Sequence, residues 1–172
     1  VGDFKDITPP SPLRLGWLGD WGASWQYEPG IVELCESALA QMQDLGHRVT
    51  TMAPPFSAAA VWPSWMTLRN WALVGSLSAL YANPDTRPRL KESAQWEVSE
   101  GHKLSALDVH KASVTRSQFF AAMASAFDVV DVLCLPCAQV WPFDVDQVHP
   151  TEINGIQMDT YHRWMEVMIP AS

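Results

Sequence analysis

The most conspicuous chemical spacing in this sequence is a pair of cysteines separated by two residues, Cys134-Leu-Pro-Cys137. Such a dithiol does redox chemistry when its first Cys lies at a helix N-terminus, where the helix dipole lowers the pKa of the thiol. Here Cys134 lies within an apolar, β-branched run over residues 129–135, which is typical of a strand. A zinc site would need a second close pair of ligands, and His149 and His162 are too scattered to supply it. We therefore expect Cys134 to be a packing residue and Cys137 an ordinary residue at the strand's end.

Other catalytic groupings are sparse. The sequence contains no G-x-S-x-G nucleophile turn, no G-x-x-x-x-G-K-[ST] phosphate loop and no G-x-G-x-x-G fingerprint. Asp159 and His162 could meet across one helical turn, but no Ser or Cys is placed beside them, so we expect a capping interaction or a surface ion pair. The lysines all lie in polar stretches, and we expect none to be a desolvated base: Lys5, Lys91, Lys103 and Lys111. The residues alone show no self-contained catalytic set.

The nine tryptophans fall into groups by their surroundings. Some occur at strand or helical spacing, and we expect them in the core: Trp17, Trp65, Trp71 and Trp96. Others, Trp21, Trp25 and Trp141, lie in loops that follow strands, where aromatic side chains can wall an apolar pocket. For Trp141 a pocket wall and plain packing remain equally open, whereas packing is favoured for Trp21 and Trp25. Ligands bind at the carboxyl ends of strands in open α/β sheets, so the candidate substrate-binding residues are Gln139, Trp141 and Phe143.

The first third of the chain predicts a βαβ unit. Residues 13–18 alternate as a short strand does, and residues 19–30 form a loop. Apolar residues then recur at three- and four-residue steps over 31–45, which predicts an amphipathic helix with Pro29 in its first turn and Gly46 as its C-cap. Residues 48–53 predict a second strand, which is parallel to the first with a right-handed crossover.

The rest of the chain predicts helices, one more strand and a final helix. We expect a helix after Pro63 that ends before the turn at 83–85, a polar helix over 89–100 capped by Gly101, and a long helix opened by a capping box at Ser105. The strand at 129–135 joins the same sheet and is buried on both faces. Two sets of side chains should face inward, Val109, Ala112, Phe119, Phe120, Met123 and Phe127 on the long helix and Tyr161, Trp164, Met165 and Met168 on a last helix over 159–169.

Composition narrows the class of protein. The 172 residues predict a single α/β domain, with a Pro-rich lead-in over 1–12. A net charge of -8 argues against a nucleic-acid partner or an anionic membrane surface. No apolar run approaches the roughly 20 residues that span a bilayer, and no signal peptide is visible. Three Cys predict no disulfide framework, so we expect a cytoplasmic location, and no motif calls for a cofactor or a metal.

An ordered set of segments resembles the amidase signature family. The match covers nearly the whole chain, and the segment Gln139-Val-Trp-Pro-Phe-Asp144 is particularly similar to bacterial amidases. The other segments that carry the resemblance are Leu13-Arg-Leu-Gly-Trp-Leu-Gly-Asp20, Leu45-Gly-His-Arg-Val49, Ala53-Pro-Pro55, Phe127-Asp-Val-Val-Asp-Val-Leu-Cys-Leu-Pro136 and Met158-Asp-Thr-Tyr-His-Arg-Trp-Met-Glu-Val-Met-Ile-Pro-Ala-Ser172.

The resemblance implies a hydrolase of carboxylic amides built on a mixed sheet covered by helices. In this family the nucleophile is a Ser in a Gly/Ser-rich signature, assisted by a second Ser in a cis peptide and by a Lys. Neither Gly75-Ser76 nor Gly22-Ala-Ser24 matches that signature, so no catalytic residue is assigned to this chain. The absence of an initial Met and the apolar end suggest the C-terminal third of such an enzyme, cut before the segment that usually follows Pro-Ala.

Two hypotheses follow from the resemblance. In the first, the chain is the substrate-pocket portion of an amidase that is inactive alone, and a small-molecule amide is the substrate of the full-length parent. In the second, it is a non-catalytic binding or structural module on the amidase scaffold. Bare strand edges and apolar surface predict self-association into a homo-oligomer.

Overall fold

The computed structural model describes residues 12–171, so nearly all of the predicted Pro-rich lead-in lies outside the described residues. Its main sheet has three strands in the order β2-β1-β3: β1 (Arg14–Trp17), β2 (Arg48–Thr51) and β3 (Val132–Cys134). Both neighbours run parallel to β1, and Leu15 pairs with Val49 on one side and Val132 on the other. The βαβ unit and the later strand that joins its sheet are therefore confirmed, as is the α/β class of the fold.

The helix between the first two strands, α1, spans Ile31–Asp44. Gly30 is its N-cap with φ 92°, and Pro29 precedes that cap, so the expectation of Pro29 in the first helical turn is wrong. The residue before the helix has a left-handed backbone conformation that Gly adopts without strain. The helix therefore begins after Gly30 and not at Pro29. Gly46 has φ 94° and ends the helix as predicted.

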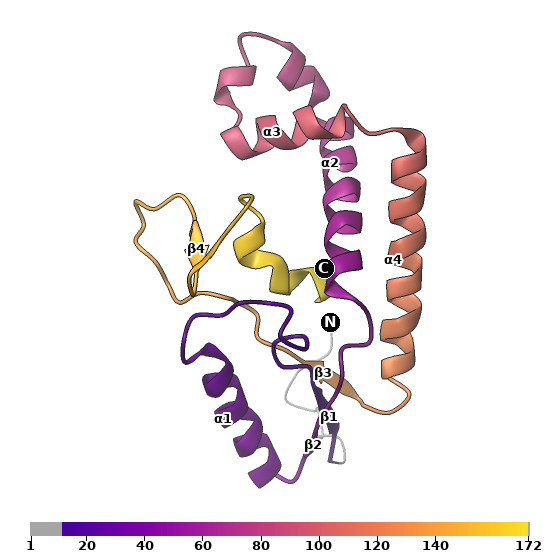
Figure 1. Cartoon of the computed structure of the whole chain (residues 1–172), viewed down its shortest axis with the longest axis vertical. Coiled ribbons are helices and arrows are strands. Elements are labelled where there is room, and N and C mark those ends of the chain that lie inside the picture. Colours follow the sequence, from indigo (N-terminus) through magenta and orange to yellow (C-terminus); the bar gives the residue numbers. More distant parts are fainter. Residues whose placement is uncertain (1–11, 172) are drawn as a thin grey trace, which may run out of the picture.

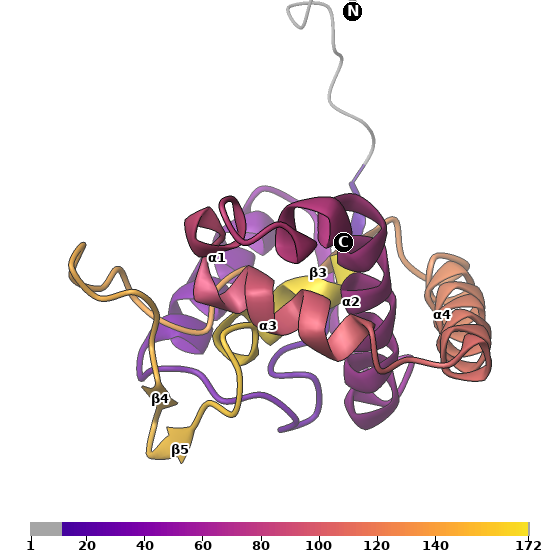
Figure 2. The same cartoon turned by 90° about the horizontal axis from the view of Figure 1, so that it is seen from above.

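A helical layer rises from the sheet (Figure 1). It consists of α2 (Ala58–Ala82), a single 3₁₀ turn η2 (Arg87–Arg89), α3 (Glu92–Gly101) and α4 (Ala106–Ala126). The helices α2 and α4 are antiparallel neighbours, and α3 crosses α2 at the end far from the sheet (Figure 2). The prediction that Pro63 precedes this helix is wrong, because Pro63 lies inside α2. The proline removes one backbone donor, and the packing of the later turns against α3 and α4 sustains the helix.

The capping box of α4 is confirmed, and its inward stripe is narrower than predicted. The Ser105 hydroxyl accepts from the Asp108 N–H at 3.2 Å, and the Ser105 N–H donates back to the Asp108 carboxylate at 2.9 Å. Ala112 is buried, whereas Phe120 is 74% exposed and Phe127 is 49% exposed. Because successive residues of a helix are about 100° apart, Phe120 cannot share the inward direction of its neighbour Phe119.

The hydrophobic core lies under the carboxyl end of the sheet. Trp21 and Trp25 are both buried and their rings stack at 4.9 Å, so packing is their role. The Trp21 indole N–H donates to the Phe56 carbonyl at 2.9 Å. Trp17 is buried as expected, but Trp71 and Trp96 are exposed, which corrects their assignment to the core. Helical spacing predicts which residues share a face but not what packs on that face. Trp71 is 55% exposed, and Trp96, whose ring lies 6.4 Å from the His162 ring, is still 40% exposed.

The strand β3 differs from the expectation of a long strand buried on both faces. It covers only three residues and forms one edge of the sheet, and Val129 and Val132 are exposed. The preceding residues turn out of α4 instead, and Asp131 at this turn accepts from the Arg14 guanidinium at 2.7 Å and from the Arg14 N–H at 2.7 Å. This fork fixes the register of β3 beside β1.

After β3 the chain forms a two-stranded hairpin and a final helical segment. The hairpin pairs β4 (Glu152–Ile153) with β5 (Ile156–Gln157) around Asn154-Gly155, whose φ values are 49° and 81°. The final segment η3 (Arg163–Ala171) is 3₁₀ with a kink at Met165 rather than one α-helix. Val167 is buried and Met168 is exposed, which reverses the inward assignment of Met168, because a kinked 3₁₀ segment does not follow the 3.6-residue period. Within residues 12–171, no helix has both the length and the apolar character to cross a bilayer.

Candidate functional site

The predicted substrate-binding residue Gln139 follows β3 and is buried. Its amide N–H donates to the Gln26 carbonyl at 3.0 Å, and its amide oxygen accepts from the Val167 N–H at 3.2 Å. One side chain thus ties the loop before α1 to η3. Both ends of the amide are hydrogen-bonded within the protein, so Gln139 positions the segments around it.

Trp141 and Phe143 lie further along the same segment and are more exposed. The Trp141 N–H donates to the Glu28 carboxylate at 2.6 Å, and its indole N–H donates to the Pro29 carbonyl at 3.0 Å. Phe143 packs edge-on against Trp164 with ring centroids 5.5 Å apart. The three predicted residues therefore share one segment at the carboxyl end of the sheet but contact different partners.

Gln139 also lines a cavity of about 290 Å³ that contains Arg163 and Glu166. Burial raises the pKa of Glu166, against the effect of the hydrogen bond that its carboxylate accepts from Arg163 at 3.1 Å. Arg163 also donates to Asp159 at 2.8 Å and lies 3.7 Å from the centroid of the Trp62 ring. The predicted pairing of Asp159 with His162 is wrong, because Asp159 pairs with Arg163, the residue that follows His162.

His162 belongs instead to a buried polar cluster with Arg69 and Glu97. The side chains of Glu97 and His162 are 3% and 1% exposed, and His162 Nε2 lies 2.8 Å from Glu97 Oε1. Arg69 Nε also donates to Glu97 and lies 3.2 Å from His162 Nε2. Since Nε2 cannot both donate and accept, and the carboxylate is the stronger acceptor, Nε2 carries a proton that it donates to Glu97. Hydrogen bonds that join α2, α3 and the last segment of the chain thus meet at one carboxylate.

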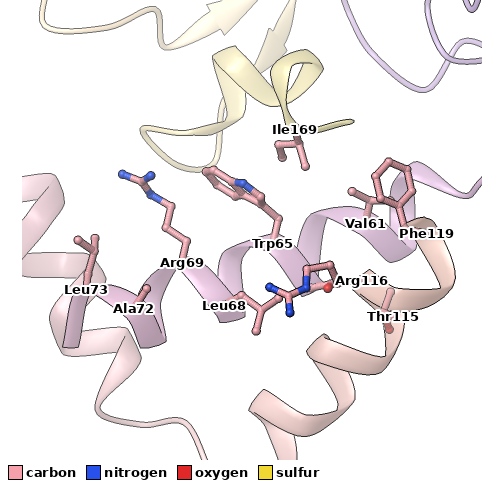
Figure 3. A pocket seen from close by; sticks show the side chains of 11 residues that line it. Val61, Trp65, Leu68, Arg69, Ala72, Leu73, Thr115, Arg116, Phe119 and Ile169 are labelled. Atoms are coloured by element: carbon pink, nitrogen blue, oxygen red, sulfur yellow. The ribbon is translucent and has the colours of Figure 1, made fainter. Parts of the chain in front are cut away.

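A groove of about 450 Å³ runs along α2 next to this cluster (Figure 3). Its floor is an apolar stripe at three- and four-residue spacing on α2, which includes Val61, Trp65, Leu68 and Ala72. Phe119 of α4 and Ile169 of η3 close its sides. Its apolar lining and size fit the body of a small organic ligand.

The described residues show no Ser or Cys side chain that a neighbouring base could activate as a nucleophile. No hydrogen bond joins a Ser or Cys side chain to a His or Lys in residues 12–171, and the buried Ser64 hydroxyl donates to the Ala112 carbonyl. Burial raises the pKa of Cys134, and all three cysteines are free thiols. This agrees with a packing role for Cys134. In the same residues, no group of His, Cys, Asp and Glu side chains is arranged to hold a metal ion.

The described residues therefore form an α/β fold with an apolar groove along α2. The family model described as Amidase matches residues 4–172. The chain therefore belongs to the amidase family.

Several solved structures share this fold. A bacterial aryl acylamidase of the amidase signature family superposes with a TM-score of 0.78 at 18% identity, over 92% of this chain and 34% of its own. An amidase gives a TM-score of 0.73 at 15% identity, over 95% of this chain and 36% of its own. A 6-aminohexanoate cyclic dimer hydrolase, solved with its substrate, gives 0.70 at 13% identity, over 95% and 36%. The chain thus spans about a third of these structures, and no curated protein matches it.

Proposed function

We propose that this chain forms the substrate-pocket portion of an enzyme that hydrolyses carboxylic amides, and that the nucleophile comes from a part of the enzyme outside these residues. The observation that carries the proposal is the superposition of more than nine tenths of the chain on about a third of an aryl acylamidase, of an amidase and of a cyclic dimer hydrolase. The chain covers about a third of such an enzyme, and its described residues contain no nucleophile–base pair. Both observations support a role as one wall of the substrate pocket. The chain alone is then inactive.

Within this proposal, the segment after β3 contributes to the pocket wall. Trp141 is 42% exposed and Phe143 is also accessible, so both can offer aromatic surface to an apolar or aryl amide. Gln139 acts as a positioning residue, because its amide holds η3 against the loop before α1. The free thiols are consistent with a reducing cytoplasm as the location.

The purified 172-residue chain is expected to release no p-nitroaniline from p-nitroacetanilide and no ammonia from benzamide. The physical reason is that an amide carbonyl needs an activated nucleophile and an oxyanion site, and residues 12–171 pair no Ser or Cys with a base. An active amidase signature enzyme under the same conditions is the control. Turnover that disappears when a Ser of this chain is replaced by Ala would contradict the proposal. Sequencing the DNA upstream of Val1 gives an independent check, because a Gly/Ser-rich signature with a spaced Lys supports it.

A second candidate function, a non-catalytic module that self-associates, is favoured by one surface. Phe127, Val129 and Val132 are exposed in the turn after α4 and on the edge strand β3, and Phe120 is exposed on the C-terminal half of α4. Such an edge beside apolar side chains can pair with the same edge of a second copy. The two functions differ in the upstream sequence, since only the first requires a catalytic signature there.

Light scattering at increasing protein concentration is expected to show a mass that rises from one chain to two. The variant Phe120→Lys should shift this equilibrium toward the monomer, because a charge cannot be buried at an apolar contact without a partner. Leu107→Lys, at an exposed apolar position at the other end of α4 (57% against 74% for Phe120), is the matched control. A monomer mass at every concentration, or a dimer that Phe120→Lys leaves intact, would rule out association through this surface.

A further inference from the structure

The groove along α2 contains one cationic side chain that the protein does not neutralise. Arg116 reaches from α4 into the space beside Leu68 (Figure 3). The ion pairs of residues 12–171 involve other side chains, and none of them includes Arg116. Arg69, which also lines the groove, already donates to the buried Glu97. The groove therefore has one uncompensated positive charge beside an apolar floor.

The neighbour of Arg116 adds a second donor. Thr115 lines the same groove, and its hydroxyl can donate to an anion that lies against Arg116. A guanidinium presents parallel N–H groups that match the two oxygens of a carboxylate, so it binds this group better than a point charge would. The chain has a net charge of -8, so an anion is attracted here by the local cation and not by the protein as a whole.

We propose that this groove binds an amphipathic monocarboxylate, with its alkyl or aryl body along the α2 stripe and its carboxylate on Arg116 and Thr115. The stripe from Val61 to Ala72 buries the apolar body, and Trp65 gives it an aromatic wall. Hydrolysis of an amide releases a carboxylic acid of this class. This inference adds a ligand class to the proposed function. Its link to hydrolysis rests on the proposed function, whereas binding of the carboxylate itself needs no turnover.

The test compares octanoate with octanamide, which differ only in the charged end. Isothermal titration of the 172-residue chain should give an affinity for octanoate about 10-fold higher than that for octanamide, as expected for one charge-assisted, bidentate contact. Arg116→Gln should remove that preference and leave octanamide binding unchanged. Arg116→Lys should keep part of it. Lys111→Gln removes the same charge from α4 at a position that does not line the groove, so it is the matched control and should keep the preference.

Two outcomes would overturn the inference. One is equal affinity of the wild-type chain for octanoate and octanamide, or no binding of either. The other is an equal loss of preference in Arg116→Gln and Lys111→Gln, which would mean that net charge and not the groove selects the anion. Neither outcome depends on the turnover assay or on the upstream signature. Failure of this proposal is therefore distinguishable from failure of the proposed function.

Discussion

Replacing Glu97 by Gln is expected to lower the free energy of unfolding by about 3 kcal/mol, the lower end of the range for breaking a buried ion pair. Glu97 accepts hydrogen bonds from both Arg69 and His162, and its carboxylate is almost fully buried. Both donors meet the same oxygen, Oε1, so a Gln side chain keeps an acceptor there but removes the negative charge, and both hydrogen bonds lose their charge assistance. The Arg69 side chain is 40% exposed and can rehydrate, whereas His162 is 1% exposed and cannot.

The same variant should change how stability depends on pH. Burial alone would raise the pKa of Glu97, but the hydrogen bonds from His162 and Arg69 outweigh burial and hold it below its usual value. A carboxyl whose pKa is lower in the folded state stabilises the protein above its unfolded pKa, and this contribution is lost as the pH falls through the folded value. The difference in the free energy of unfolding between wild type and Glu97→Gln should therefore be constant from neutral pH down to about pH 5. This gap should shrink below about pH 4.

Urea unfolding at a series of pH values measures this gap. Glu92→Gln is the control, because Glu92 is an exposed carboxylate in the first turn of the same helix, where it contributes less than about 1 kcal/mol through the helix dipole. Equal stability of wild type and Glu97→Gln at neutral pH would show that the cluster is held by packing. A gap that widens on acidification would show that the pKa of Glu97 is raised and not lowered.

The sequence predicted the parts of the fold whose signal is local. Periodicity located α1, the cap at Ser105 located α4, and apolar runs located the three strands of the main sheet. The Asn154-Gly155 dipeptide is a strong hairpin signal, and attention to it could have predicted β4 and β5. Inward faces were less predictable: Phe119 and Phe120 are equally apolar, and only the position of α2 decides that the first faces the groove.

The site was less predictable because it depends on contacts between distant parts of the chain. Arg69 and His162 are 93 residues apart, and each has an ordinary helical or polar neighbourhood in sequence. Gln139 was singled out from its place after a strand, and the structure shows which carbonyl and amide it joins. No periodicity or motif encodes those partners. Only the tertiary fold brings these partners together. The sequence therefore predicted the segment in which Gln139 lies but not the residues that it contacts.

Gly101→Ala and Gly75→Ala are expected to change stability in opposite directions. Both glycines are helical, so the intrinsic preference of Ala for helices would raise the stability of each variant by up to about 1 kcal/mol. At Gly75 an added methyl group meets nothing within 4 Å, so that gain should be realised. At Gly101 the methyl carbon would lie 2.5 Å from the Asn70 carbonyl oxygen and 2.5 Å from a Val74 methyl carbon. A helix carbonyl cannot rotate away, so α3 must move from α2, at a cost of about 2 kcal/mol.

This close approach also supports the buried cluster, because Gly101 and Glu97 are one turn apart on α3 and Asn70 follows Arg69 on α2. Separation of the helices at Gly101 should lengthen the contact between Arg69 and Glu97. Thermal or urea unfolding of the single and double variants measures this coupling: Glu97→Gln should cost less in the Gly101→Ala background than in wild type. Strict additivity would mean that α3 accommodates the methyl group without moving its Glu97 end. In that case the glycine sets only the local fit of the helices, and the cluster positions itself.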